Sequence, residues 1–332
     1  MSELLVLAPG LLTTVQDLGR ERFGPLGVSP SGAGDAVSLR VGNRLVGNAE
    51  GAAALEMTLL GGTFQFPQGA VAALTGSDFG ATLDGAVIAP WSSFEIQPGQ
   101  TLRLGPTRSG ARCYLCVRGG IDVRPFLGSA STHLLSGLGG HEGRALRKGD
   151  VLRIGDATRA REKRTGKNTC STEKVHDSNR ARKVAPKVLE RLAPRKVLRV
   201  TPGPQTEWFP EASQQIFYGS TYRVAEESNR MGLRLEGPPI PEGAHGEMIS
   251  EGVSLGAVQI AAGGLPIILF VEQQTTGGYA KIANVISADL HSLGQLRPRD
   301  EIRFELVDWE IARRLLIEQE ELLASEELIQ AT

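Results

Sequence analysis

The chain has 332 residues, of which 41% are hydrophobic, with 36 basic and 37 acidic side chains. That length predicts about two domains, and the apolar content is sufficient for ordinary hydrophobic cores, which excludes bulk disorder. The near-zero net charge excludes a protein whose whole surface binds nucleic acid, and the 41 glycines predict many tight turns between short strands.

The first half of the chain predicts one helix followed by short strands. Asp35 is a good N-cap, apolar residues follow at a spacing of four, and Gly47 ends the pattern, so we expect a helix over 35–47. Strands separated by Pro-Gly and Gly-Gly turns are predicted at 69–75, 93–96, 101–104 and 113–117.

A basic segment follows, in which residues 158–196 include 13 Lys or Arg and 4 Asp or Glu. It has few large apolar residues, so we interpret 158–195 as a flexible linker. An arm that binds RNA or an acidic partner is the alternative. The segment has no aromatic residue to stack on bases, and we expect no nucleic-acid partner.

The second half predicts strands at 196–200, 215–218, 257–260 and 266–271. A Leu/Glu-rich helix is expected at the C-terminus, from about 309 to about 330. We therefore expect β domains at 1–157 and 196–306, and a helical segment at 307–332.

One pattern recurs in both halves, consisting of a turn, a polar residue and an alternating strand. Its copies lie at 98–104, 148–154 and 298–304. The last two copies close the two halves, which predicts two domains of similar construction, each strand having one buried face.

The cysteines and the chain start indicate a cytoplasmic protein without a membrane partner. Three cysteines give no disulfide framework. The first residues lack a secretory signal, and the longest apolar run, 260–271, is too short to span a bilayer.

Several common cofactor motifs are absent from the sequence. It contains no G-x-x-x-x-G-K-[ST] phosphate loop and no H-E-x-x-H motif. Cys113 and Cys116 form a C-x-x-C pair, but residues three apart on a strand point to opposite faces. We therefore expect no metal site.

Two polar, glycine-rich segments are the candidates for a binding site; they are 10–20 continued by 27–35, and 271–281. Their glycines let backbone N–H groups approach a ligand closely. Arg20 and Lys281 can neutralise a carboxylate or phosphate. Ser31 and the first N–H groups of the helix that starts at Asp35 can hold an anion. The alternative is that these are turns whose side chains satisfy their own backbone.

These segments resemble the family of biotin-dependent carboxyltransferase-like proteins, also called allophanate hydrolase subunit 2 or KipA, which includes the PxpC component of bacterial 5-oxoprolinase. The matching stretches are PGLLTTVQDLGR at 9–20, PSG at 30–32, NRLVGN at 43–48, GGIDV at 119–123, SEG at 250–252, QTTGGY at 274–279 and VISADL at 285–290. Gly34 and Ala280 depart from the family's usual Met and Pro, which leaves substrate choice open more than fold.

The resemblance implies a mainly β chain with two cyclophilin-like β-barrel domains, a few short helices and a C-terminal helix. It implies an ATP-dependent 5-oxoprolinase complex that opens 5-oxo-L-proline to L-glutamate, with ATP bound by the complex. The implied partners are a KipI- or PxpB-like subunit, of the allophanate hydrolase subunit 1 type, and a PxpA-like subunit.

Site roles follow from the same resemblance. Arg20 and Lys281 are expected to neutralise phosphate or the substrate carboxylate, and Asp17 or Asp35 to accept a proton or position a cation. With these catalytic residues Asp17, Arg20 and Lys281 we expect substrate-binding residues Gln16, Ser31, Gly32, Asp35, Gln274, Thr275, Thr276, Gly277, Gly278 and Tyr279.

Two alternatives remain within the family. In the first, the chain moves a carboxyl group from carboxybiotin to urea or a similar amide. None of its four methionines precedes a lysine, so it is not expected to carry covalent biotin and would need a separate biotinylated chain. In the second, the chain is a KipA-like regulator that binds a KipI-like kinase inhibitor.

Overall fold

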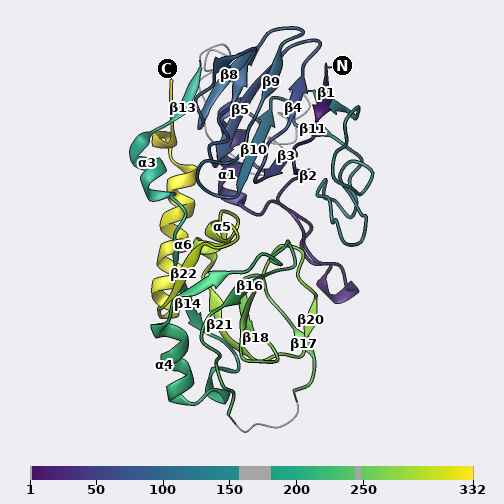
Figure 1. Ribbon diagram of the computed structural model, residues 1–332. Helices are drawn as coiled ribbons and strands as arrows, with labels where there is room; N and C mark the ends of the chain where they lie inside the picture. Colours follow the sequence, from purple (N-terminus) through teal and green to yellow (C-terminus); the bar gives the residue numbers. More distant parts are fainter. Residues whose placement is uncertain (1, 157–180, 244–247, 332) are drawn as a thin grey trace. The chain divides into compact units, whose positions relative to one another are not determined.

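The computed structural model describes residues 2–156, 181–243 and 248–331, and the chain is mainly β, as expected (Figure 1). It divides into two compact units. Unit 1 comprises Met1–Gly19, Asp35–Leu192 and Leu322–Thr332, and unit 2 comprises Arg20–Gly34 and Ala193–Glu321. The units are therefore not the consecutive stretches that we expected, because segment 20–34 belongs to unit 2 and the C-terminal residues belong to unit 1.

The described residues of unit 1 form two seven-stranded sheets that share one apolar core. Their strands are β1 (Ser2–Ala8), β2 (Leu12–Gln16), β3 (Ala54–Thr58), β4 (Thr63–Gln65), β5 (Ala70–Gly76), β6 (Thr82–Leu83), β7 (Ala86–Val87), β8 (Ser92–Ile96), β9 (Thr101–Arg103), β10 (Arg112–Val117), β11 (Ile121–Asp122), β12 (Val151–Ile154), β13 (Arg182–Val184) and β23 (Ile329–Ala331). One sheet has the order β11-β12-β1-β4-β9-β6-β7, and the other has the order β2-β3-β10-β5-β8-β13-β23.

Helix α1 (Ala36–Val46) packs on β5 and β10 of unit 1, which confirms the helix predicted there. Asp35 caps it by accepting a hydrogen bond from Ser38 N at 2.8 Å, and Gly47 ends it in the left-handed conformation. A Cβ on Gly42, in the middle of the helix, would lie 2.6 Å from Cys116 Sγ. Glycine at this position therefore allows the helix to approach the sheet closely.

The two cysteines of β10 point to opposite faces, as the strand geometry predicted. Cys113 belongs to the core shared by the sheets, whereas Cys116 Sγ contacts the carbonyl oxygen of Leu39 in α1 at 3.8 Å. Burial raises the pKa of both thiols. Neither thiol is therefore primed to act as a nucleophile or a metal ligand.

Unit 2 contains a closed barrel with the strand order β14-β21-β18-β19-β16-β15-β22 (Figure 1). These strands are β14 (Val197–Pro202), β15 (Tyr222–Val224), β16 (Gly232–Glu236), β18 (Ala257–Ile260), β19 (Pro266–Leu269), β21 (Lys281–Val285) and β22 (Glu301–Leu306). A short ribbon pairs β17 (Glu251–Gly252) with β20 (Thr276–Gly277). The unit also contains η1 (Gly24–Leu26), η2 (Thr206–Trp208), η3 (Ser287–Asp289) and α5 (Leu290–Leu293).

Residues 215–218, which were expected to form a strand, lie instead in helix α4 (Glu211–Gly219). The buried residues of this helix, Ser213 and Phe217, are four positions apart, which is a helical spacing. The Phe217 ring stacks on Phe304 of β22 with ring centroids 4.4 Å apart. A run of four residues is too short to distinguish a strand from a helix by periodicity.

Part of the segment that we interpreted as a flexible linker is ordered in unit 1. Strand β13 pairs with β8 and β23, and helix α3 (Pro186–Arg191) follows it with proline at its start. Val184 and Val188 are buried, and these few apolar contacts were hidden by the basic composition. The rest of the expected linker, residues 157–180, lies outside the described residues, as does the RNA-binding alternative for it.

The C-terminal helix is shorter than expected. Helix α6 (Trp309–Ala324) ends before residue 330, and η4 (Glu326–Leu328) and β23 follow it. Pairing of β23 with β13 takes the last residues into a sheet of unit 1. Across the described residues, no helix has the length and apolarity needed to cross a membrane.

The recurring pattern forms the same turn three times, at 97–100, 147–150 and 297–300. In each copy, the backbone N–H of the first residue donates to a side-chain oxygen of the last residue, at 2.8, 2.7 and 2.9 Å respectively. The third residue is Gly99, Gly149 or Arg299, with φ of 85°, 93° and 71°. Strands β9, β12 and β22 follow these turns, so the local prediction is confirmed in both units.

Candidate functional site

The first polar segment divides between the units, and Gln16 and Asp17 lie in unit 1 at the end of β2. Gln16 is fully buried, and its Nε2 donates to Thr14 Oγ1 at 3.0 Å and to the carbonyl oxygen of Thr132 at 3.1 Å. These bonds tie β2 to the loop around residue 132. The position of Gln16 is thus set by contacts within unit 1.

The carboxylate of Asp17 organises the loop 129–131. Its Oδ1 accepts hydrogen bonds from Gly19 N at 2.8 Å and from the hydroxyls of Ser129 and Ser131, and its Oδ2 accepts one from Ala130 N at 2.7 Å. These donors fill the roughly four acceptor positions of a carboxylate. The geometry therefore favours a structural role for Asp17 over the proton transfer that we expected.

Asp35 joins a buried network in unit 1. Besides capping α1, it donates its backbone N–H to Tyr114 Oη at 2.8 Å, and that hydroxyl donates to Glu56 Oε2 at 2.7 Å. Arg112 Nε lies 3.3 Å from Glu56 Oε1. Burial and the neighbouring Glu56 carboxylate raise the pKa of Tyr114 well above its usual range. Asp35 thus acts as a helix cap held by a neutral tyrosine.

The remaining residues of the first segment, Arg20, Ser31 and Gly32, are in unit 2. The carbonyl oxygen of Gly32 accepts a hydrogen bond from Arg230 Nη2 at 2.6 Å, and Arg230 Nε lies 2.5 Å from Glu272 Oε1. Arg230 and Glu272 are both buried. Glu272 belongs to the second polar segment, so this ion pair connects parts of both segments within unit 2.

Lys281 begins β21 and is the buried cation of the second segment, with only 4% of its side chain exposed. Its Nζ lies 2.7 Å from Glu251 Oε1, and Gln205 Nε2 donates to the same oxygen at 2.8 Å. Gln205 Oε1 in turn accepts the backbone N–H of Lys281 at 3.1 Å. These hydrogen bonds, from Lys281 first and then Gln205, lower the pKa of Glu251. We call these three residues the lysine cluster.

Two amide groups converge on Gly277, next to the lysine cluster. A Cβ on Gly277 would lie 2.6 Å from Gln259 Nε2 and 3.2 Å from Gln274 Nε2. Gln259 lies opposite Lys281 in the pairing of β18 with β21, and Gly277 lies opposite Glu251 in the pairing of β17 with β20. The missing side chain at Gly277 therefore leaves room for both amides beside the lysine cluster.

Gln259 has a hydrogen-bond donor to spare. Only 1% of its surface is exposed, and its Nε2 has no partner among the described residues. Its Oε1 accepts a long hydrogen bond of 3.4 Å from Gln274 Nε2. A buried donor without a partner is costly, and a ligand with an acceptor oxygen would satisfy it.

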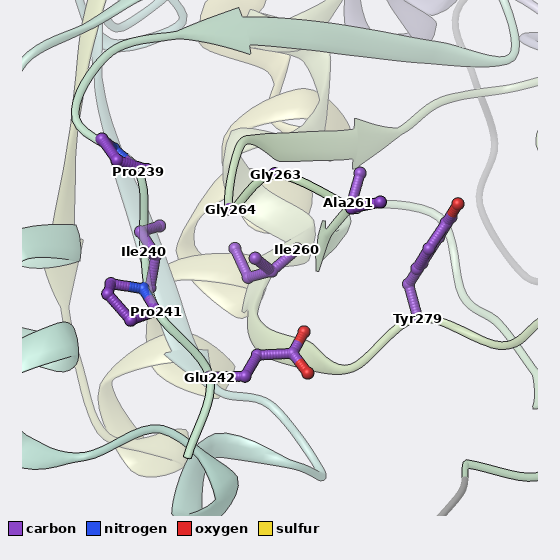
Figure 2. Close-up of a pocket in the computed structure, with 10 residues that line it drawn as sticks. Pro239, Ile240, Pro241, Glu242, Ile260, Ala261, Gly263, Gly264 and Tyr279 are labelled. Carbon is purple, nitrogen blue, oxygen red and sulfur yellow. The ribbon is translucent and has the colours of Figure 1, made fainter. Parts of the chain in front are cut away.

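A cavity of about 390 Å³ lies beside these residues in unit 2 (Figure 2). Residues 239–242 line one side of it and the Tyr279 ring lies on the other side, with Ile260 and the turn 261–264 between them. Ile260 follows Gln259, and the carbonyl oxygen of Tyr279 is 3.5 Å from Lys281 Nζ. The polar site therefore has an open, mostly apolar space next to it.

The structure thus brings together only part of the predicted set. Gln274, Gly277 and Lys281 surround one polar site, whereas Gln16, Asp17 and Asp35 are held by bonds within unit 1. The other residues of the second segment are Thr275, which is half-buried, and Thr276, Gly278 and Tyr279, which are exposed.

Sequence reasoning missed three residues of the site, Gln205, Glu251 and Gln259. Glu251 stands in the Ser-Glu-Gly stretch that matched the family, which was a signal that could have been used. Gln205 and Gln259 stand in no motif, and strand pairing alone brings them to Lys281.

A family model described as carboxyltransferase domain, subdomain A and B, matches residues 26–306. The C-type subunit of the 5-oxoprolinase of Escherichia coli (strain K12) is 38% identical over 301 residues, which are 91% of this chain and 90% of that protein. The urea amidolyase of Saccharomyces cerevisiae is 35% identical over 332 residues, which cover 96% of this chain and 17% of that protein.

A solved structure, the urea amidolyase of K. lactis, superposes on the chain with a TM-score of 0.86 and 32% identity. It covers 99% of this chain, and this chain covers 20% of it. The chain therefore spans about a fifth of the length of that enzyme, but most of the length of the E. coli subunit.

Proposed function

Because the chain belongs to the family of carboxyltransferase domains with subdomains A and B, we propose that it is the carboxyltransferase-like, PxpC-type subunit of an ATP-dependent 5-oxoprolinase. One observation carries this choice within the family. The chain matches a separate oxoprolinase subunit over 90% of that subunit's length, whereas it matches only 17% of urea amidolyase. A chain of this extent fits a subunit that works with other chains.

The chemistry of the proposed reaction requires activation of a poor electrophile, the carbonyl group of a five-membered lactam. ATP bound by the complex supplies the phosphoryl group that activates the lactam oxygen. Lys281 and the two glutamine amides at Gly277 are donors that bind and orient oxygen atoms of the lactam. Fixed donors in a site that excludes water stabilise the negative charge that develops on oxygen.

The partners in this proposal are a KipI- or PxpB-like subunit and a PxpA-like subunit. The E. coli relative is named as one lettered subunit of a 5-oxoprolinase, which supports an assembly of several chains. The sequence has no G-x-x-x-x-G-K-[ST] loop of its own, so ATP is assigned to the complex. The cavity beside Tyr279 gives an apolar space for the lactam ring.

The test is co-expression of the chain with these two partner subunits, followed by an assay of glutamate release from 5-oxo-L-proline. We expect one complex to co-purify and to release glutamate only with ATP. Omission of each subunit in turn is the control. A complex that assembles and hydrolyses no oxoproline would refute this function, and a stable pair with the KipI-like protein alone would favour the regulatory alternative.

Carboxyl transfer to urea is the second candidate. The superposition on urea amidolyase with a TM-score of 0.86 over 99% of the chain favours it. It requires a biotinylated partner chain, because no methionine of this chain precedes a lysine. The measurement is urea-dependent loss of a labelled carboxyl group from that partner, with 5-oxo-L-proline as the competing acceptor. Transfer to urea without oxoproline hydrolysis would select this function.

A further inference from the structure

The lysine cluster contains an unequal ion pair. Lys281 is 4% exposed and begins a barrel strand, so its ammonium group cannot reach water without disrupting β21. Glu251 is 46% exposed and lies on the short ribbon outside the barrel. The carboxylate can therefore leave the pair at little cost, whereas the ammonium group cannot.

The groups that bind Glu251 are the groups that would bind a carboxylate from outside. Glu251 Oε1 accepts from Lys281 Nζ at 2.7 Å and from Gln205 Nε2 at 2.8 Å. Gln205 is fixed because its own oxygen accepts the backbone N–H of Lys281. One cation and one fixed amide therefore remain in place when Glu251 turns away.

Gln259 supplies the independent observation that a ligand is missing. Its Nε2 is buried, has no partner among the described residues, and lies 2.6 Å from the Cβ position of Gly277. Gly277 is the register partner of Glu251 on the ribbon. The unused donor thus lies behind the place that Glu251 covers, and Glu251 itself does not satisfy it.

We propose that Glu251 is a displaceable counter-ion, and that a carboxylate ligand takes its place on Lys281 and Gln205 and accepts the unused hydrogen bond of Gln259. This inference rests on the proposed function, and it names Glu251 as the residue that sets the affinity for charged ligands. A neutral ligand gains nothing from displacing Glu251, so the site selects anions. The carboxylate comes either from the lactam substrate or from the carboxyl group that is transferred.

The experiment measures binding to the full-length chain by calorimetry with three probes, 5-oxo-L-proline, its neutral analogue 2-pyrrolidinone, and bicarbonate. Removing a competitor that occupies most of the site raises apparent affinity by the inverse of the free fraction. We expect Glu251→Gln to tighten binding of a carboxylate probe by about fivefold to tenfold. Binding of 2-pyrrolidinone should not change.

Glu226→Gln is the matched control, because Glu226 is also exposed and pairs with a basic residue, Arg299, at 2.8 Å in the same unit. It should leave all three affinities unchanged. Lys281→Met should abolish carboxylate binding, and thermal unfolding of each variant confirms that it is folded. If Glu251→Gln does not fold, Glu251→Ala replaces it with the same expectation.

The probes also separate the two sources of the carboxylate. An effect of Glu251→Gln on oxoproline assigns the site to the substrate, and an effect on bicarbonate alone assigns it to the transferred group. The inference is overturned if Glu251→Gln changes neither carboxylate, if 2-pyrrolidinone responds equally, or if no carboxylate binds. Glutamate release by the complex is scored separately, so failure of that activity with the Glu251 effect intact refutes the proposed function alone.

Discussion

The polar clusters of the two units differ in what they leave unused. In unit 1, Asp17 receives four hydrogen bonds from its own loops, and its carboxylate is saturated. In unit 2, Lys281 pairs with a half-exposed carboxylate, and the neighbouring Gln259 keeps a buried donor without a partner among the described residues. Both clusters lie in segments that match the family, yet only the second has the spare capacity to bind a ligand.

This contrast indicates that a family motif can be retained for structure or for chemistry. A saturated cluster lowers the free energy of the fold and offers nothing to a ligand. A cluster with an unused donor costs stability until it is filled, which is typical of binding sites. Substitutions in unit 1 should therefore change stability, and substitutions around Lys281 should change binding and activity.

The largest effect is expected at Lys281. Lys281→Met removes the buried cation, and loss of one fixed donor to a developing charge costs about 100-fold or more in rate. We expect kcat/KM for ATP-dependent glutamate release by the complex to fall by at least that factor, with the unfolding midpoint changed little. A folded variant that keeps its full activity would remove Lys281 from the site and contradict the contrast between the units.

The next effect is expected at Asp17. Asp17→Asn turns an acceptor into a donor among Gly19, Ser129, Ala130 and Ser131, which should lower the free energy of unfolding by about 2–3 kcal/mol. Urea unfolding measures the loss, with Asp122→Asn at an exposed position of the same unit as the control. If Asp17→Asn proves as stable as the control and loses activity, the catalytic role first expected for Asp17 is restored.

A smaller, pH-dependent effect is expected at Asp150 in the repeated turn of unit 1. Hydrogen bonds from Arg144, at 2.8 and 3.0 Å, lower the pKa of Asp150 to about 2. Because its folded pKa lies below its usual value, this group stabilises the fold at higher pH, and the contribution is lost as pH falls from about 4 to 2.

Asp150→Asn should therefore cost about 1–2 kcal/mol at pH 7, after allowing for screening by solvent. The difference from the native chain should vanish near pH 2. Unfolding curves recorded between pH 2 and 7 measure it. A difference that stays constant over this range would mean that the ion pair contributes nothing.

The smallest effect tests the backbone of the same turn. Gly149 has φ of 93° and open space around its Cβ position, whereas unit 2 has Arg299 at this point with φ of 71°. We expect Gly149→Ala to cost about 1 kcal/mol through backbone strain alone. Gly219→Ala, which has equally open space and lies in helix α4, should cost nothing. Equal stability of both variants would show that the turn tolerates any residue.

Local features of the sequence predicted much of the fold. The three turns depend on hydrogen bonds within four residues, and the cap of α1 depends on Asp35 and Ser38, so neighbouring residues determine them. The helix α4 was missed because its identity depends on the packing of Phe217 against Phe304. The order of β13 was missed because it depends on pairing with β23, almost 150 residues away in the chain.

Residues close together in the chain were enough to predict the mainly β class, the repeated turns, the family and the importance of Lys281. Which polar residues form the site depends instead on the folded chain. Gln205 and Glu251 reach Lys281 from other loops, and Gln259 reaches it through the pairing of β18 with β21. Strand pairing joins distant residues without leaving a local pattern, which is why the saturated Asp17 and the unsaturated Gln259 could not be told apart before the chain was folded.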